Sequence, residues 1–204
     1  IVAFCLIFAT KEVKTVRNIS FITTTFVLAL ALKLFMDYEA NSSMQFVVNV
    51  PWIENYGINY YLGLDGFSLT ILMMIAILIP SSYVLLWKKD NKSYFINMLL
   101  VQTGVTGALL SLDIVLFYFF WELMLIPIFL MIGMYGSGDK VATTLKVTIY
   151  TMAGSLFMLL AIFYLGMSYF NEFGTWSFAY NELAKISSLD ASTKTWLFLA
   201  FLFA

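Results

Sequence analysis

The chain has 204 residues, of which 62% are hydrophobic and 11% charged, and its formal net charge is −1. Soluble domains are about 45–50% apolar and about 25% charged, so this composition predicts a protein that faces lipid and argues against a soluble enzyme. The sequence has no histidine, and its one cysteine, Cys5, can form neither a disulfide pair nor an iron–sulfur cluster by itself. The balanced charge also argues against nucleic acid binding, and we expect any redox chemistry on another chain.

Long apolar runs define the expected elements. A helix needs about 20 apolar residues to cross the hydrocarbon layer, whereas a barrel strand needs only about 9–11 alternating ones. The runs are continuous and long, so we predict an all-α polytopic transmembrane helix bundle, organised as a single transmembrane domain over residues 1–204 with seven crossings, five of them complete. In chain order the predicted spans are residues 1–10, 18–36, 62–87, 93–111, 113–135, 141–170 and 195–204.

The first and last runs start at Ile1 and stop at Ala204, so we expect both terminal spans to be cut and the chain to be a fragment. A signal-peptide core is the alternative for residues 1–10. No basic segment precedes that run and no small-x-small cleavage site follows it, which favours a truncated span.

The positive charges predict an orientation. Residues 11–17, 88–92 and 136–140, with Lys146 just beyond, carry eight of the eleven Lys and Arg residues. Because Lys and Arg collect on the cytoplasmic side, we expect these loops to be cytoplasmic and the N-terminus to be outside. Residues 37–61 and 171–195 are then external, and they are long and aromatic enough to lie flat on the membrane surface.

Glu122 is the first candidate for chemistry. Nine residues from Asp113, it lies about 13.5 Å into its predicted helix, near the middle of a roughly 30 Å hydrocarbon layer, in a stretch with no other charge. An ionised carboxylate there costs on the order of 2.5–3.5 kcal/mol, so it needs a cation, water or a proton. The alternative is a carboxylate that only pins two helices through a buried pair. Tyr118 shares its helix face, and Pro127 removes the hydrogen bond to the Leu123 carbonyl nearby; core packing and an ordinary helix kink are the simpler roles of these two residues.

Lys146 and Asp113 are further candidates. Lys146 lies about five residues inside its span, from where its side chain can reach the interface, so a structural role is an equal alternative. It is one to two turns nearer the cytoplasm than Glu122, which makes a tight pair doubtful. Asp113 and Asp65 lie at outer helix ends, where capping is the simpler explanation and an outer proton exit the alternative.

Small residues predict close helix contacts in two spans. Thr103, Gly107 and Ser111 share one face of the fourth span, with Gly104 and Ala108 beside them, and residues 153–155 do the same in the sixth.

Four motifs carry a family resemblance. Residues 119–129 (FFWELMLIPIF), 64–69 (LDGFSL), 111–120 (SLDIVLFYFF) and 146–150 (KVTIY) resemble, in order and spacing, chain M (subunit 4) of the proton-pumping NADH:quinone oxidoreductase, respiratory complex I. The sister chains L and N share the buried glutamate but lack the MLIP ending, which favours chain M. The resemblance covers nearly the whole chain from about Asn18.

The resemblance implies a charged axis through the membrane that couples quinone reduction elsewhere to proton translocation. It assigns Glu122 to this axis and, more weakly, Lys146 and Asp113; the partner lysine is expected just beyond Ala204, on the helix that begins near Thr195. The chain would then be the N-terminal part of a subunit with about fourteen helices. It would carry no cofactor itself, because NADH, FMN, iron–sulfur clusters and quinone are expected on partner subunits.

The expected partners are neighbouring antiporter-like membrane subunits, lipid and protons, in a bacterial inner or mitochondrial inner membrane. The alternative is a subunit of a multi-subunit sodium/proton antiporter, which genomic neighbours would distinguish.

Overall fold

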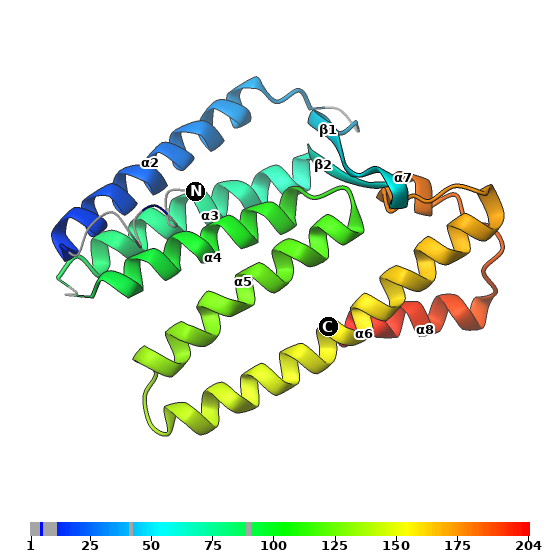
Figure 1. The fold of residues 1–204 in the computed structure, drawn as a ribbon. Helices are drawn as coiled ribbons and strands as arrows, with labels where there is room; N and C mark the ends of the chain where they lie inside the picture. Colours follow the sequence, from blue (N-terminus) through cyan, green and yellow to red (C-terminus); the bar gives the residue numbers. More distant parts are fainter. Residues whose placement is uncertain (1–4, 6–11, 41–42, 89–90) are drawn as a thin grey trace.

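A computed structural model describes residues 5, 12–40, 43–88 and 91–204 (Figure 1). Within this part, five helices are long and apolar enough to cross a membrane. They are α2 (Val13–Asp37), α3 (Gly66–Leu85), α4 (Lys92–Leu110), α5 (Ile114–Tyr135) and α6 (Lys140–Phe173). Two shorter helices follow, α7 (Tyr180–Leu183) and α8 (Ala191–Leu202). The predicted helical bundle is confirmed; its first span, residues 1–10, lies outside the described residues except for Cys5.

An antiparallel hairpin interrupts the helices between α2 and α3. It consists of β1 (Gln45–Ile53), the short 3-10 turn η1 (Glu54–Tyr56) and β2 (Ile58–Leu64). The predicted span of residues 62–87 was therefore too long at its start, because residues 62–64 belong to β2. Asp65 sets the boundary: its carboxylate accepts the Ser68 amide at 2.7 Å and so caps α3.

Two other helix starts also differ from the predicted spans. α2 begins at Val13 rather than at residue 18, because Lys14 and Arg17 are good helix formers and no Gly or Pro interrupts the run. α8 begins at Ala191 rather than at residue 195, because the Asp190 carboxylate accepts the Thr193 amide at 3.2 Å. That residues 1–204 form one domain stays a prediction.

The helices pack in chain order, α2 with α3 and α4, then α4 with α5, α5 with α6, and α6 with α8. Small residues allow these approaches, as predicted. A Cβ atom on Gly104 would lie 2.6 Å from the Met124 Cβ, and one on Gly154 would lie 2.5 Å from the Phe203 carbonyl oxygen. Both positions therefore need glycine, on α4 against α5 and on α6 against the end of α8.

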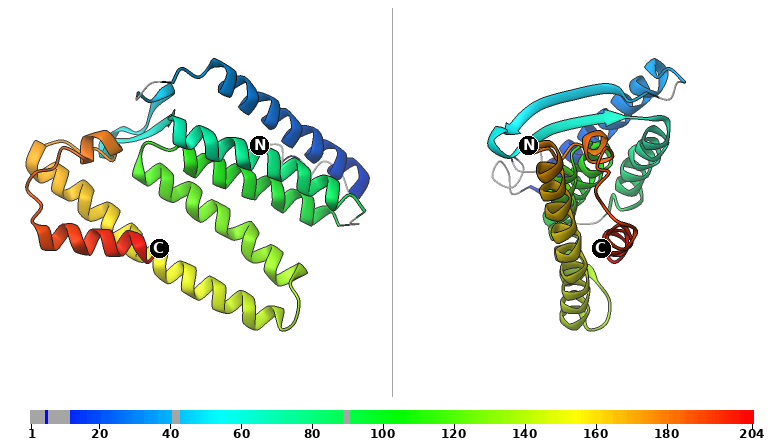
Figure 2. Two further views of the ribbon diagram at one scale, coloured as in Figure 1. Left: turned by 180° about the vertical axis from the view of Figure 1, so that it is seen from behind. Right: turned by 90° about the vertical axis from the view of Figure 1, so that its right-hand side faces the viewer.

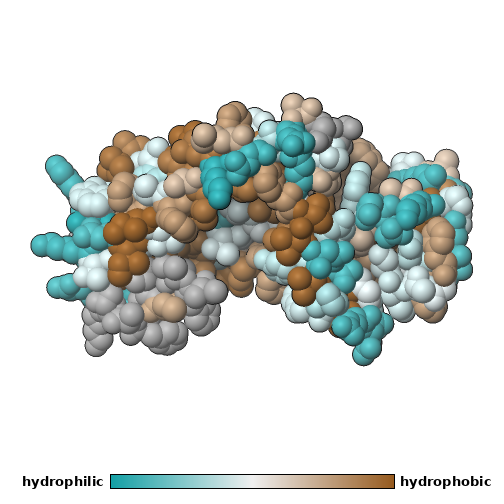
Figure 3. Space-filling view, turned by 90° about the horizontal axis from the view of Figure 1, so that it is seen from above, coloured by the Kyte–Doolittle hydropathy of each residue, from teal (hydrophilic) through white to brown (hydrophobic). Residues whose placement is uncertain are grey.

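The alternating helices give the bundle two distinct ends. The start of α2 and the α3–α4 and α5–α6 connections form one end, which we call the basic end because it carries Lys14, Arg17, Lys88, Lys92 and Lys140. Figure 3 shows hydrophilic side chains projecting at one end of the molecule, and apolar and hydrophilic side chains side by side over its middle. The hairpin, the α4–α5 turn and α7 form the opposite end, the hairpin end, in every view (Figure 2).

Candidate functional site

Glu122 lies in the middle of α5. It follows Ile114 by eight residues, which places it about 12 Å from the hairpin end of the helix and about 20 Å from Tyr135. Its Oε1 atom is buried and has no hydrogen-bond partner among the described residues. Buried polar atoms are nearly always paired with protein or water, so an unpaired carboxylate oxygen at this depth needs a partner such as water, a proton or a cation.

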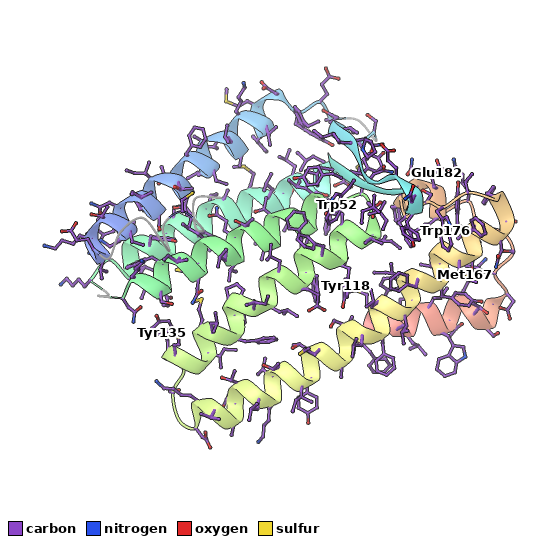
Figure 4. All side chains as sticks on the ribbon, viewed as in Figure 1. Trp52, Tyr118, Tyr135, Met167, Trp176 and Glu182 are labelled. Carbon is purple, nitrogen blue, oxygen red and sulfur yellow. The ribbon has the colours of Figure 1, made fainter. Side chains whose placement is uncertain are left out.

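Tyr118 lies between Glu122 and the next helix. It is one turn before Glu122 on α5, and its hydroxyl lies near the Glu122 carboxylate and near the Ser155 side chain of α6. Figure 4 shows Tyr118 on the side of α5 that faces α6. Ser155 is buried, and its Oγ donates to the Met152 carbonyl at 3.1 Å. The small-residue segment of α6 therefore lies level with Glu122, and the shared helix face of Tyr118 and Glu122 is confirmed.

An apolar cluster covers the site on the side of the hairpin end. Ile58, Met158, Ile162 and Phe178 are buried there, and Tyr118 and Trp121 pack against them. This cluster joins β2, α6 and the segment before α7 to the start of α5. Pro127, on the other side of Glu122, is also buried, and α5 continues through it to Tyr135.

Lys146 does not approach Glu122. It is exposed and lies six residues after Lys140, about 9 Å from the basic end, which is about two turns nearer that end than Glu122. Within the described part of the chain no ion pair joins the two; the pair that forms is Lys185–Glu182, near the hairpin end, with 2.7 Å between Nζ and Oε1.

Asp113 is completely buried at the start of α5. Its Oδ1 accepts the Val115 and Leu116 amides at 2.9 and 3.2 Å, and its Oδ2 accepts the Asn59 amide at 3.0 Å. The first two bonds are the helix cap that the sequence indicated. The third bond joins α5 to β2, and no local sequence signal announces it.

Sequence reasoning also missed a mostly apolar cavity of about 450 Å³ between α2, α4 and β2, with several polar side chains in its wall. Thr23, Tyr60, Gln102 and Thr106 lie in its wall together with apolar residues, and Phe120 of α5 closes one side. The Gln102 Nε2 and Thr106 Oγ1 atoms are buried without a partner among the described residues. Their spacing of four residues, within an apolar run, is the signal that could have identified them.

Metal ligation finds no support in the described residues, where no group of three or more His, Cys, Asp or Glu side chains comes together.

Comparison with known proteins finds similar membrane subunits. Residues 111–204 match the family model described as NADH:quinone oxidoreductase/Mrp antiporter, TM. The chain is 34% identical over 96% of its length to F(420)H(2) dehydrogenase subunit M of Methanosarcina mazei, and 32% identical over 94% to NADH-quinone oxidoreductase subunit M of Escherichia coli K12. It covers 41% and 40% of these relatives, so it spans about two fifths of their length.

Solved structures show the same fold. Respiratory complex I from Thermus thermophilus superposes with a TM-score of 0.84 at 23% identity, over 99% of this chain and 40% of that one. The Mrp complex from Dietzia sp. DQ12-45-1b gives 0.79 at 22% identity, over 98% and 37%. The predicted resemblance to chain M and the predicted location in a bacterial or mitochondrial inner membrane are confirmed. The chain is thus similar, over residues 111–204 to the NADH:quinone oxidoreductase/Mrp antiporter family and over most of its length to relatives named subunit M or chain 4.

Proposed function

We propose that this chain is part of a proton-translocating subunit of a respiratory NADH:quinone oxidoreductase, and that Glu122 is the group that takes up and releases the proton. The observation that carries the proposal is the buried, unpaired Oε1 of Glu122 at the middle of a membrane-spanning helix. A carboxylate in this position is stable when it can share its charge with a proton, water or a nearby cation. Reversible protonation meets that requirement.

Electrostatic coupling between two groups moves the proton. Glu122 exchanges its proton with, or electrostatically biases, the lysine expected just beyond Ala204, on the helix that begins with α8. Neutralising either group shifts the pKa of the other. An opposite charge within about 4–6 Å changes a carboxyl pKa by about 1–3 units, which is enough for loading and release. The end of α8 supports this arrangement, because the Phe203 carbonyl contacts α6 at Gly154, next to the Ser155 that interacts with Tyr118.

Uptake is from the basic end. The buried apolar cluster around Ile162 and Phe178 closes the hairpin end of the site, whereas Lys146 lies between Glu122 and the basic end. We assign Lys146 a secondary role as a charge near the entrance, and Tyr118 and Ser155 a hydrogen-bonding role beside Glu122. Asp113, the third candidate, accepts hydrogen bonds from three backbone amides at the outer end of α5.

The electron chemistry belongs to partner subunits. Relatives named subunit M occur in complexes that oxidise different donors, F(420)H(2) in one and NADH in another, so the shared membrane chain does not select the donor. NADH, FMN, iron–sulfur clusters and quinone are assigned to other subunits, with neighbouring antiporter-like chains as direct partners. This assignment agrees with the absence of histidine and the single cysteine in the sequence.

The test is Glu122→Gln in the assembled complex. The amide is nearly isosteric and removes only the ionisable group, so we expect proton pumping and coupled quinone reduction to fall at least about tenfold while assembly survives. Glu54→Gln is the matched control, because Glu54 is exposed at the hairpin end and its change removes the same charge. Normal pumping in assembled Glu122→Gln complex would refute the proposal.

A transport assay without quinone or electron donor separates the antiporter alternative, which the shared family model keeps open. A sodium/proton antiporter subunit would exchange sodium for protons in vesicles without any quinone or electron donor. A respiratory subunit would pump only while quinone is reduced.

A further inference from the structure

Two aspartates cap outer helix ends, and their hydrogen bonds differ. Asp65 caps α3, and among the described residues its carboxylate bonds within its own helix start, to the Ser68 amide at 2.7 Å and the Ser68 hydroxyl at 2.6 Å. Asp113 caps α5 with Oδ1, whereas its Oδ2 accepts a hydrogen bond from the amide of Asn59, a residue 54 positions earlier in the chain. The Asp65 carboxylate therefore bonds to one helix, and the Asp113 carboxylate bonds to both α5 and β2.

The residues next to Asp113 extend this connection. The Leu112 amide donates to the Tyr61 carbonyl at 2.8 Å, the Ile114 amide to the Phe178 carbonyl at 3.0 Å, and the Tyr180 amide to the Leu112 carbonyl at 2.9 Å. We call the three segments joined in this way, residues 59–61, 112–116 and 176–180, the hairpin junction. Asp113 is its buried centre.

The tip of the hairpin seats on the same junction. Gly57 has a φ of +61°, and a Cβ atom there would lie 2.0 Å from the Trp176 carbonyl oxygen. Tyr56 also meets Trp176 edge to face, with 6.4 Å between ring centroids. Figure 4 shows Trp176 beside the hairpin at this end. The hairpin is thus held at its tip by close packing against Trp176, and at Asn59 by a hydrogen bond to the Asp113 carboxylate.

We infer that Asp113 is a positioning residue whose carboxylate ties the hairpin to the start of α5 and so fixes the depth of Glu122, nine residues further along that helix. The link to Glu122 rests on the proposed function; the tie itself does not. A carboxylate is suited to this role because it offers two acceptor oxygens and no donor. Protonation of Oδ2 would remove its charge and weaken the hydrogen bond that it accepts from the Asn59 amide, so proton transfer through Asp113 would loosen the junction.

Asp113→Asn isolates the tie. Asparagine keeps one oxygen for the helix cap but places an NH₂ group against the Asn59 amide, so α5 stays capped while the hairpin bond is lost. Asn59→Pro is the complementary variant, because it removes the same amide donor and leaves the Asp113 carboxylate in place. Asp65→Asn is the matched control at the other capped helix.

The measurement is hydrogen–deuterium exchange of the assembled complex, together with the ratio of protons pumped to electrons transferred. Asp113→Asn and Asn59→Pro should both raise exchange in residues 58–64 and 176–182 by about tenfold, and Asp65→Asn should not. Both variants should lower turnover and keep the proton-to-electron ratio. Unchanged exchange in both variants would overturn the tie. If the proton-to-electron ratio fell in Asp113→Asn but stayed normal in Asn59→Pro, Asp113 would instead be a proton carrier, whatever the outcome at Glu122.

Discussion

The two ends of the bundle are built in different ways. At the basic end, side chains make the connections: Arg17 stacks on the Trp87 ring at 4.4 Å and donates to the Trp87 carbonyl at 2.7 Å, and the Tyr135 hydroxyl donates to Asn91 at 2.7 Å. At the hairpin end, backbone amides and carbonyls join segments far apart in sequence around one buried carboxylate. Side-chain links between exposed helix ends tolerate movement, whereas a buried backbone junction fixes its elements in one arrangement.

The first prediction asks which side of the membrane each end occupies, and its outcome is all or none. In a Cys5→Ser background, Lys88→Cys at the basic end should stay unlabelled by an impermeant thiol reagent applied to intact cells. Asn181→Cys at the hairpin end should react, because positive charges remain cytoplasmic. The reverse labelling pattern would contradict the predicted orientation.

The second prediction compares two glycines with positive φ, one at each end. Gly138, near the basic end, has a φ of +74°, and a Cβ atom there would have no neighbour within 4 Å among the described residues, whereas Gly57 meets the Trp176 backbone. Gly138→Ala should lower the free energy of unfolding only by the penalty for a left-handed backbone conformation, about 1–2 kcal/mol. Gly57→Ala has the same penalty and adds a clash with backbone atoms that cannot rotate away, so we expect it to lower the free energy of unfolding by about 2–5 kcal/mol in total.

The melting temperature of the purified complex and its yield from membranes measure this difference. Equal losses for the two glycine variants would show that the hairpin tip yields easily and that the hairpin end is no more rigid than the basic end.

The third prediction concerns the side-chain link at the basic end. Arg17→Lys keeps the charge but loses the planar group that stacks on Trp87 and reaches its carbonyl, so it should destabilise the α2–α3 contact by about 1–2 kcal/mol. Lys14→Arg is the control, since Lys14 is exposed on the same helix. Thermal unfolding followed by Trp fluorescence measures the effect, and a Lys14→Arg loss as large as that of Arg17→Lys would argue against a specific link.

The smallest expected effect is at the exposed Glu182–Lys185 pair of the hairpin end. Hydrogen bonding to Lys185, with a further bond from Tyr169, lowers the pKa of Glu182 below its usual value. A lowered pKa stabilises the fold above the unfolded-state value, and this stabilisation is lost as the pH falls through the lower folded-state value. Glu182→Gln should therefore slightly reduce stability at pH 7, this effect should disappear once the pH is below the lowered folded-state pKa of Glu182, and added salt should shrink the difference.

The sequence predicted the helices well because each helix signal is local. Continuous apolar length placed four spans to within a few residues, and aspartate or asparagine at positions such as 113 and 91 marks a helix start by its own capping bond. The depth of Glu122 followed directly from α5, since rise per residue is fixed. Its proton chemistry and the roles of Lys146 and Asp113 stay predictions.

The hairpin end was not predictable in the same way. Residues 45–53 resemble an interfacial segment because their alternation is weak. The strand with which they pair, and the hairpin tip before it, contact Leu112 and Trp176, which lie far along the chain. The identity of Asn59 does not indicate that its backbone N–H, rather than its side-chain amide, makes the bond to Asp113. Sequence patterns report what a residue does within one turn or one strand; they carry little information about a bond that spans 54 residues.

The length of α6 makes the membrane itself part of this architecture. Its 34 residues measure about 51 Å, and at tilts of about 20–40° such a helix still extends about 39–48 Å along the bilayer normal, well beyond a hydrocarbon layer of about 30 Å. The ends of this helix therefore lie beyond the hydrocarbon layer, and the bilayer thickness decides how much of each end does. Ser155 lies near the midpoint of α6, which stays inside the layer at any of these tilts. The ends of α6, rather than the region beside Glu122, are thus the part of the subunit most exposed to bilayer thickness, and reconstitution in lipids of graded acyl-chain length tests this.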